Sequence, residues 1–317
     1  MTYSTLISAA QLRDLQAGGT DLQVWDCSFD LMNPTAGPAA FAQAHIARAR
    51  YVYLDTDLSD KTPATDKPAD KASAAMPYEA PASGAMPYEA PASGGRHPLP
   101  SRTKFAAWLG AMGVTPSTQV VVYDRNGCNY CGRAWWMLQW LGHTQVAVLD
   151  GGLQAWQAAG GAVESGETGK NTHSPDFSLP KYPVVQVSTA QAAIDFVAQA
   201  AQSGSHTIID ARAAPRFRGE VEPLDPVAGH IPGALNRPFN LNIGADGLFK
   251  PAATLRAEFD ALLAGRNASQ VIHHCGSGVS AIPNVLAMAI AGYPPTQLFA
   301  GSWSEWSNRA DLPVARG

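Results

Sequence analysis

The sequence predicts an α/β protein of two similar domains, each a mainly parallel sheet with helices on both faces. Apolar runs of strand length alternate with helical stretches, as in residues 119–124, 132–142 and 145–150, and this alternation is typical of parallel sheets covered by helices. The chain of 317 residues is long enough for two domains of roughly 100–200 residues each. A weak internal repeat indicates the same division.

The repeat consists of pairs of matching segments. VAVLDGGLQAW (146–156) and TQLFAGSWSEW (296–306) share an apolar strand, a turn glycine and a final tryptophan, and these tryptophans lie 150 residues apart. Further upstream, AHIARA (44–49) matches GHIPGA (229–234) with a larger offset of 185 residues. The larger offset indicates that the first copy contains an insertion.

The insertion coincides with a low-complexity tract. AMPYEAPASG occupies residues 75–84 and is repeated without change in residues 85–94, and sequence this rich in Pro, Ala, Ser and Gly favours a mobile surface loop. We therefore predict an N-terminal domain at 1–160, with an insertion at about 57–96. A linker follows at 161–183, and a C-terminal domain at 184–317.

Composition and charge exclude two classes of protein. Lys and Arg number 22 against 26 Asp and Glu, and the formal net charge of −4 offers no basic excess for nucleic-acid phosphates. The longest apolar runs, such as 285–290, are far shorter than the ~20 residues that span a bilayer, and the first residues lack the features of a secretory signal. We expect a cytoplasmic protein, a monomer or weak dimer, without nucleic-acid or membrane partners.

The four cysteines, Cys27, Cys128, Cys131 and Cys275, are too few for a disulfide framework. Cys27 follows an apolar run and is interpreted as a packing residue. Cys128 and Cys131 have CxxC spacing; packing near the domain interface is the favoured interpretation, and a redox role is the alternative. A zinc site needs two further ligands, and no second CxxC or HxxxH pair accompanies this one, so no metal or other cofactor is expected.

Cys275 follows QVIHH (270–274), in which VIHH is a plausible strand, and precedes a Gly-Ser-Gly loop and an apolar stretch, 279–291. The glycines allow the loop to curl so that its N–H groups point inward and hold an anion. The N-terminus of the following helix favours a thiolate. We interpret Cys275 as a nucleophile, with a buried packing residue as the alternative.

The residues around Cys275 argue against two other interpretations. A cysteine-dependent phosphatase needs an arginine six residues after the cysteine, but that residue is Ala281, and no Arg or Lys occurs before Arg309. His273 and His274 precede Cys275 on a predicted strand, where neighbours point to opposite faces. We therefore interpret both as strand-end residues rather than as a catalytic base.

Four motifs together resemble those of the two-domain rhodanese-like sulfurtransferases: CGSGVSA (275–281), DARxxxRF (210–217), GHIPGALN (229–236) and GSWSEW (301–306). The resemblance implies two tandem rhodanese-like domains, of which only the C-terminal one carries the catalytic cysteine. Asp124 stands at the position that matches Cys275, which implies an inactive N-terminal domain. The uncharged loop is similar to the CGSGVT of 3-mercaptopyruvate sulfurtransferases rather than to the cationic CRKGVT of thiosulfate-preferring members.

The resemblance also implies a reaction and its residues. Sulfur would move from 3-mercaptopyruvate to Cys275 as a persulfide, and then to a thiol, thioredoxin or cyanide. Ser277 would assist proton movement at the sulfur, Arg216 would bind the substrate carboxylate, and His45 matches a histidine suggested to support the serine from the N-terminal domain. The remaining candidate substrate-binding residues belong to the loop: Gly276, Gly278, Val279 and Ser280.

The segment that follows Arg216 departs from the family. A second substrate arginine is expected there, yet residues 220–230 (EVEPLDPVAGH) contain no Lys or Arg. Arg218 and Arg237 are the candidate replacements. Two further functions stay open at this point: a thiosulfate sulfurtransferase, and a non-catalytic sulfur carrier or regulatory module.

Overall fold

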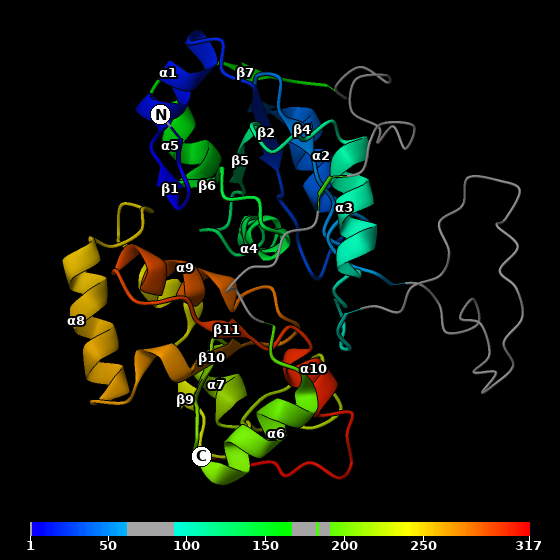
Figure 1. Ribbon diagram of the computed structural model, residues 1–317, viewed down its shortest axis with the longest axis vertical. Coiled ribbons are helices and arrows are strands. Elements are labelled where there is room, and N and C mark those ends of the chain that lie inside the picture. The colour runs from blue at the N-terminus through cyan, green and yellow to red at the C-terminus, as the bar shows by residue number, and fades with distance from the viewer. Residues whose placement is uncertain (1, 62–91, 167–181, 184–190) are drawn as a thin grey trace, which may run out of the picture.

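The computed structural model describes residues 2–61, 92–166, 182–183 and 191–317, and these residues form two α/β domains (Figure 1). Most of the decapeptide repeat, residues 75–91, and most of the predicted linker lie outside the described residues. No helix within the described ranges is long and apolar enough to cross a membrane.

The N-terminal domain contains a five-stranded sheet in the order β1-β6-β5-β2-β4, in which every neighbouring pair is parallel. In that order the strands are Leu6–Ile7, Val146–Leu149, Gln119–Tyr123, Leu22–Asp26 and Arg50–Tyr51. The helices α1 to α5 are Ala9–Ala17, Ala36–Gln43, Arg102–Ala111, Cys131–Leu141 and Gly152–Ala158. A short antiparallel pair, β3 and β7, joins His45–Ile46 to Val163–Glu164.

The alternation of side chains along β5 explains why helices cover both faces of this sheet. Val120 and Val122 share a core cluster with residues of α3 and α4, whereas Val121 and Tyr123 share one with residues of α1, α2 and α5. Successive side chains of a strand point to opposite faces. A strand that is apolar at every position must therefore be covered on both sides.

The C-terminal domain repeats this arrangement with a parallel sheet in the order β11-β10-β8-β9. In that order the strands are Gln297–Leu298, Val271–His274, Thr207–Asp210 and Leu235–Asn236. A parallel bridge from Gln191 to Leu298 occupies the edge where the first domain has β1. The helices α6 to α10 are Ile194–Ser203, Ala214–Phe217, Ala252–Leu263, Ile282–Ile290 and Ser302–Trp306, and short 3₁₀ helices span Phe239–Asn242 and Ala268–Gln270.

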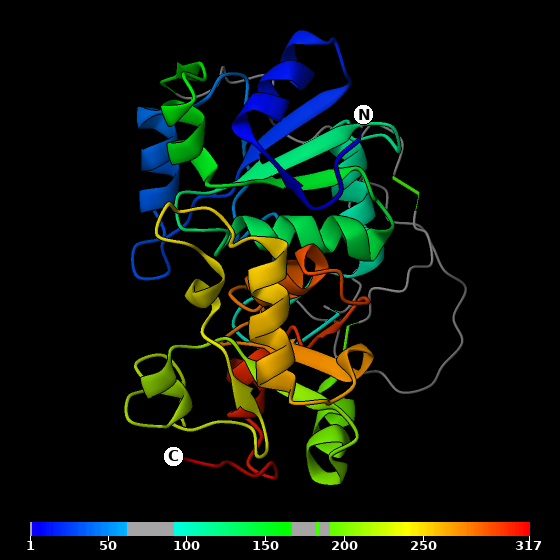
Figure 2. The same cartoon turned by 90° about the vertical axis from the view of Figure 1, so that its left-hand side faces the viewer.

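The two domains pack through α4 and α9, which face each other at their boundary (Figures 1 and 2). Every residue of α4 except Gln139 is buried, so this Trp-rich helix belongs to the interior at the boundary between the domains. Gly132 lies at the crossing, where an added Cβ would come within 3.0 Å of Ile282 Cγ2. One apolar cluster runs through both domains, so burial holds them in a fixed arrangement.

The segments on either side of residues 62–91 are packed against each other. Asp60 N–H donates to the Pro98 carbonyl oxygen at 2.8 Å, and Ala92 N–H donates to the Leu99 carbonyl oxygen at 2.8 Å. Leu58 is completely buried. The described ends of the predicted insertion, 57–61 and 92–96, therefore belong to the folded domain.

Candidate active site

Cys275 lies where β10 ends, in the loop that leads to α9. Every residue of β10 is buried, and Cys275 is 2% exposed. Its N–H donates to Ser302 Oγ at 3.1 Å. The loop turns at Gly278, whose φ is +72° and whose added Cβ would overlap the Ala300 carbonyl oxygen, so only glycine fits there.

The N–H groups of the loop are available to an anion. Within the described residues, none of the N–H groups of residues 276–281 donates to an acceptor. The carbonyl groups of Cys275 and Gly276, in contrast, accept from Trp303 N–H at 3.0 Å and Ser304 N–H at 2.8 Å. These two carbonyl groups thus point toward α10, and the N–H groups of the loop form an anion-binding nest at the N-terminus of α9. The predicted loop residues Gly276, Gly278, Val279 and Ser280 all belong to it.

Ser277 is connected to a histidine and a carboxylate of the N-terminal domain. Ser277 Oγ lies 2.7 Å from His97 Nδ1, and His97 Nε2 lies 3.3 Å from Asp55 Oδ1. Lys61 Nζ contacts the same carboxylate oxygen at 2.6 Å. The three side chains form a chain from Asp55 through His97 to the loop of Cys275.

The electrostatics of this chain favour a neutral imidazole. Burial lowers the pKa of His97, although Asp55 opposes this effect. His97, and then Lys61, hold the pKa of Asp55 at about 2. With its proton on Nε2, facing the ionised Asp55, His97 can accept the proton of the Ser277 hydroxyl at Nδ1.

The prediction that His45 supports Ser277 is wrong, because His45 has a different place in the structure. Its Nδ1 lies 2.8 Å from the Phe41 carbonyl oxygen, its ring stacks on Phe41, and its Nε2 lies 3.8 Å from Glu164. His230, its counterpart in the second domain, has the same relation to Phe217. The histidine of this repeated element therefore stabilises the chain locally in each domain.

Arg216 extends from α7 to the loop of Cys275. Its Nε and Nη2 donate to Glu222 at 3.3 and 2.6 Å, and Nη2 also contacts Asp225 at 3.2 Å. An ideal Cβ on Gly276 would lie 3.5 Å from Arg216 Nη1. The predicted carboxylate-binding arginine is thus held beside the nucleophile by two acidic residues.

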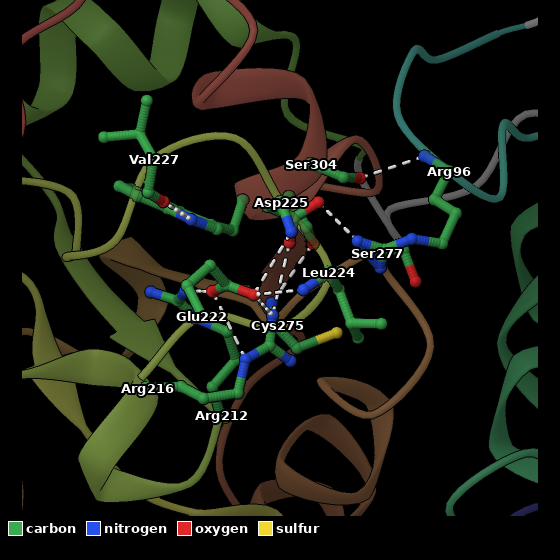
Figure 3. Close-up of polar contacts among 12 residues, drawn as sticks. Arg96, Arg212, Arg216, Glu222, Leu224, Asp225, Val227, Cys275, Ser277 and Ser304 are labelled. Atoms are coloured by element: carbon green, nitrogen blue, oxygen red, sulfur yellow. Dashed lines mark hydrogen bonds and ion pairs between the residues drawn. The ribbon is translucent and has the colours of Figure 1, made fainter. Parts of the chain in front are cut away.

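Neither predicted replacement for the missing second arginine lies at this site. Arg218 pairs with Glu220 on the surface, and Arg237 binds Asn242 and Glu258. Arg96, which follows the low-complexity tract, is there instead: it pairs with Asp225. Figure 3 shows the contacts that link Arg216 to Asp225, and Asp225 to Arg96, next to Cys275.

Sequence reasoning missed Asp55, Arg96 and His97 because they lie at the two ends of the tract assigned to the insertion, and Arg96 falls within its predicted bounds. A usable signal was nevertheless present. The basic pair Arg96-His97 stands directly after sequence that lacks histidine and arginine over residues 57–95, and an aspartate precedes the same tract. Residues that border an insertion are brought together when its two ends meet.

Arg133 of α4 is a completely buried cation near the same loop. It donates only to carbonyl oxygens: Leu58 at 3.3 Å, Gly278 at 3.0 Å and His97 at 3.0 Å. Burial lowers its pKa to about 9, and Cys275 acts in the opposite direction. Within the described residues no carboxylate pairs with this charge, so it contributes a positive potential at the loop.

The other cysteines are buried packing residues, as the favoured interpretation predicts. Burial raises the pKa of Cys27 and of Cys131 well above the usual range, which disfavours their thiolates. Cys128 is 5% exposed, and all four cysteines are unpaired. No group of metal-binding side chains occurs within the described residues.

The two histidines before Cys275 are completely buried in β10. Burial lowers the pKa of His273 to about 3 and also lowers that of His274. His274 Nδ1 lies 3.2 Å from the Cys275 carbonyl oxygen, and its Nε2 faces Asp210 at 3.6 Å. Both are neutral strand residues at physiological pH.

Comparisons with known proteins agree with this architecture. The profile of the rhodanese-like domain matches residues 8–159 and 194–309. The chain is 41% identical over 322 residues to a probable 3-mercaptopyruvate sulfurtransferase of Pseudomonas aeruginosa, with 100% of both chains covered. It is 37% identical over 315 residues to the putative thiosulfate sulfurtransferase SseB of Mycobacterium tuberculosis, covering 98% of this chain and 97% of that relative.

Solved structures give the same result. The 3-mercaptopyruvate sulfurtransferase from Leishmania major superposes with a TM-score of 0.75 at 27% identity, over 98% of this chain and 76% of that one. SseA from Escherichia coli, a 3-mercaptopyruvate sulfurtransferase, gives a TM-score of 0.69 at 27% identity, over 96% and 100% of the two chains.

Proposed function

Because the chain belongs to the rhodanese-like family and is a sulfurtransferase, we propose that it takes sulfur from 3-mercaptopyruvate onto Cys275 and transfers it to a thiol. The observation that carries this proposal is the combination of an open amide nest with the chain from Ser277 through His97 to Asp55. The nest suits an anionic sulfur on Cys275. The chain of Ser277, His97 and Asp55 suits a reaction in which a proton must also move.

The first half-reaction balances without an external acid or base. The Cys275 thiolate attacks the sulfur of 3-mercaptopyruvate, the carbon–sulfur bond breaks, and its electron pair becomes the enolate of pyruvate. The proton that the substrate thiol gives up is transferred through Ser277, assisted by His97, to the methylene carbon of the enolate. The products are pyruvate and a Cys275 persulfide anion, which the N–H groups of residues 276–281 stabilise.

In the second half-reaction an acceptor thiolate attacks the outer sulfur of the persulfide. The sulfur–sulfur bond breaks, Cys275 leaves as the thiolate, and the acceptor carries the sulfur away as a new persulfide. Small thiols and thioredoxin are the thiol acceptors that we propose. Cyanide is the third proposed acceptor: its carbon attacks the same outer sulfur, Cys275 leaves as the thiolate, and the product is thiocyanate. The same proposal places the protein in the cytoplasm as a monomer or weak dimer.

Thiosulfate is the second candidate donor, and the name of the Mycobacterium tuberculosis relative supports it. Sulfite leaves thiosulfate as a stable anion and needs no proton. The contact of 2.7 Å between Ser277 Oγ and His97 Nδ1 would then be unused. No cation occurs within the loop 275–281 to bind the dianion, so we favour 3-mercaptopyruvate.

One experiment tests the donor and the nucleophile together. Pyruvate release from 3-mercaptopyruvate and sulfite release from thiosulfate are measured for the wild type and for Cys275→Ser, with cyanide as acceptor. We expect rapid pyruvate release, slower sulfite release, and neither with Cys275→Ser. Mass spectrometry after 3-mercaptopyruvate alone should find one added sulfur atom on Cys275.

Two outcomes would overturn the proposal. Preference for thiosulfate would make the protein a thiosulfate sulfurtransferase. Absence of turnover with both donors, while Cys275 still accepts a sulfur from another persulfide, would support the non-catalytic carrier.

A further inference from the structure

Two guanidinium groups converge above Gly276, beside the nucleophile. An ideal Cβ on Gly276 would lie 3.5 Å from Arg216 Nη1 and 3.8 Å from Arg96 Nη1. Both arginines are partly exposed, with 19% and 22% of their side chains accessible. The missing side chain of Gly276 therefore leaves a space that is bordered by two partly exposed cations.

The edges of these guanidinium groups that face Gly276 are unused. Arg216 employs Nε and Nη2 for Glu222 and Asp225, and Arg96 employs Nη2 for Asp225. Within the described residues, neither Nη1 donates to an acceptor. The two acidic side chains thus fix the guanidinium groups from behind and leave one nitrogen of each directed at the loop.

Arg96 is held in this position by contacts with the C-terminal domain. Its N–H donates to Ser304 Oγ at 2.9 Å, and Ser304 is the residue whose own N–H binds the Gly276 carbonyl oxygen. The preceding Gly95 has a φ of +84° and would overlap the Gly301 carbonyl oxygen if it carried a Cβ. Figure 3 shows Arg96 linked to both Ser304 and Asp225.

Asp225 is the residue that allows Arg96 to stand where the family's second substrate arginine is expected. It lies in the segment 220–230, where a second arginine is expected and no Lys or Arg occurs. A carboxylate there cannot bind an anionic donor, but it can hold a cation that comes from elsewhere in the chain.

We propose that Arg96 is the second substrate-binding arginine and that it binds the donor carboxylate together with Arg216. One carboxylate oxygen accepts from Arg96 Nη1 and the other from Arg216 Nη1, which suits a planar carboxylate. This inference rests on the proposed function, because it assumes a donor with a carboxylate next to the thiol-bearing group. It also makes substrate binding dependent on the packing of the two domains, since one arginine comes from each.

Donors that differ in a single group provide the test. Arg96→Gln is compared with the wild type for 3-mercaptopyruvate and for 1-mercaptopropan-2-one, which keeps the thiol and the ketone but has no carboxylate. We expect kcat/KM for 3-mercaptopyruvate to fall about 10- to 100-fold, mainly through KM, because a charge-assisted hydrogen bond is lost. For the uncharged donor the change should be less than about threefold.

Two further variants guard against an indirect effect. Arg96→Lys keeps the positive charge but lacks the planar guanidinium group, and should give an intermediate KM for 3-mercaptopyruvate. Arg218→Gln removes an arginine that pairs with Glu220 on the surface and should leave both donors unaffected. Thermal unfolding of each variant reports whether the domains still pack.

The outcomes separate this inference from the proposed function. If the wild type releases no pyruvate, the proposed function fails and the inference with it. If the wild type releases pyruvate but Arg96→Gln keeps its KM, or loses activity equally with both donors, the role of Arg96 is overturned and the proposed function stands.

Discussion

The loops that follow β5 and β10 have the same place in the two domains, but the N–H groups of the first loop have an acceptor and those of the second have none in the part of the chain that the structure describes. In the first domain the Asp124 carboxylate accepts from four of them, those of Asn126, Cys128, Tyr130 and Cys131, at 2.8 to 3.1 Å. In the second domain Cys275 stands at the corresponding position. There the N–H groups of residues 276–281 have no acceptor within the described residues.

The difference teaches that one fold can make either a filled or an open anion site. A carboxylate that belongs to the chain occupies the first nest, so we expect that loop to be structural. On the proposed function, the second nest is left for a negative charge that forms on sulfur during the reaction. A single side chain at the end of the central strand decides between the two.

The first domain nevertheless takes part in the site of the second. Asp55, Arg96, His97 and Arg133 all come from it and lie at or beside the loop of Cys275. The domain without a nucleophile supplies the groups that we expect to bind the donor and move its proton. On the proposed function, the two domains divide the labour of the reaction between them.

Replacing Cys275 by Asp should make the second loop resemble the first, with the largest effect on turnover. Pyruvate release should fall by more than about a thousandfold, because the thiolate that we propose to attack the donor sulfur is lost. The new carboxylate should accept from the loop amides as Asp124 does, so calorimetry should show a higher Tm than for Cys275→Ser, which is equally inactive. An Asp variant less stable than the Ser variant would contradict the equivalence of the two nests.

Arg133→Met removes the buried cation that the first domain places at the second loop. We expect kcat for 3-mercaptopyruvate to fall about 10- to 100-fold, since the positive potential near the thiolate is lost. Alkylation of Cys275 by iodoacetamide at fixed pH, followed by mass spectrometry, should slow in parallel. Arg133→Lys keeps the charge and should recover part of both rates; equal losses in the two variants would show that only shape matters.

Asp55→Asn tests whether the first domain also controls the proton. Burial lowers the pKa of His97, and Asp55 raises it, so removal of the carboxylate should lower the pKa of His97 further. An NMR titration, with the His97 signal assigned from His97→Gln, measures this direction. The kcat for pyruvate release should fall by about tenfold because the imidazole loses the group that orients it. An upward shift of the His97 pKa would contradict the arrangement.

The sequence predicted the part of the site that is contiguous in the chain. It did not predict the residues that reach the site from distant segments. The strand, the cysteine and the Gly-Ser-Gly loop follow one another from residue 271 to 278, so local patterns placed Cys275 at the end of a buried strand. The internal repeat likewise predicted two α/β domains in tandem. His97 and Arg96 meet that loop only because two domains pack and because the ends of the tract come together, and neither event leaves a periodic signal.

The repeat also misled in one respect. His45 matches His230, and this match is structural in both domains, since each ring stacks on a phenylalanine four or more residues earlier and faces its carbonyl oxygen. A residue shared by an inactive and an active copy is more readily explained by the fold than by the reaction. The groups particular to one copy, such as Arg96 and His97, are the better candidates for chemistry.

Asp124→Asn opens the filled nest and should change turnover the least. The amide keeps one oxygen, which can still accept two of the four hydrogen bonds. Its NH₂ group faces the other two N–H donors, and those two hydrogen bonds are lost. Chemical unfolding should show a loss of about 2–4 kcal/mol, because hydrogen bonds to a charged acceptor are among the stronger ones and buried unpaired donors are costly. Pyruvate release should change by less than about threefold at temperatures where the variant is folded. A large loss of kcat without a loss of stability would mean that the first loop acts in the reaction, and the contrast between a structural and a chemical nest would then be wrong.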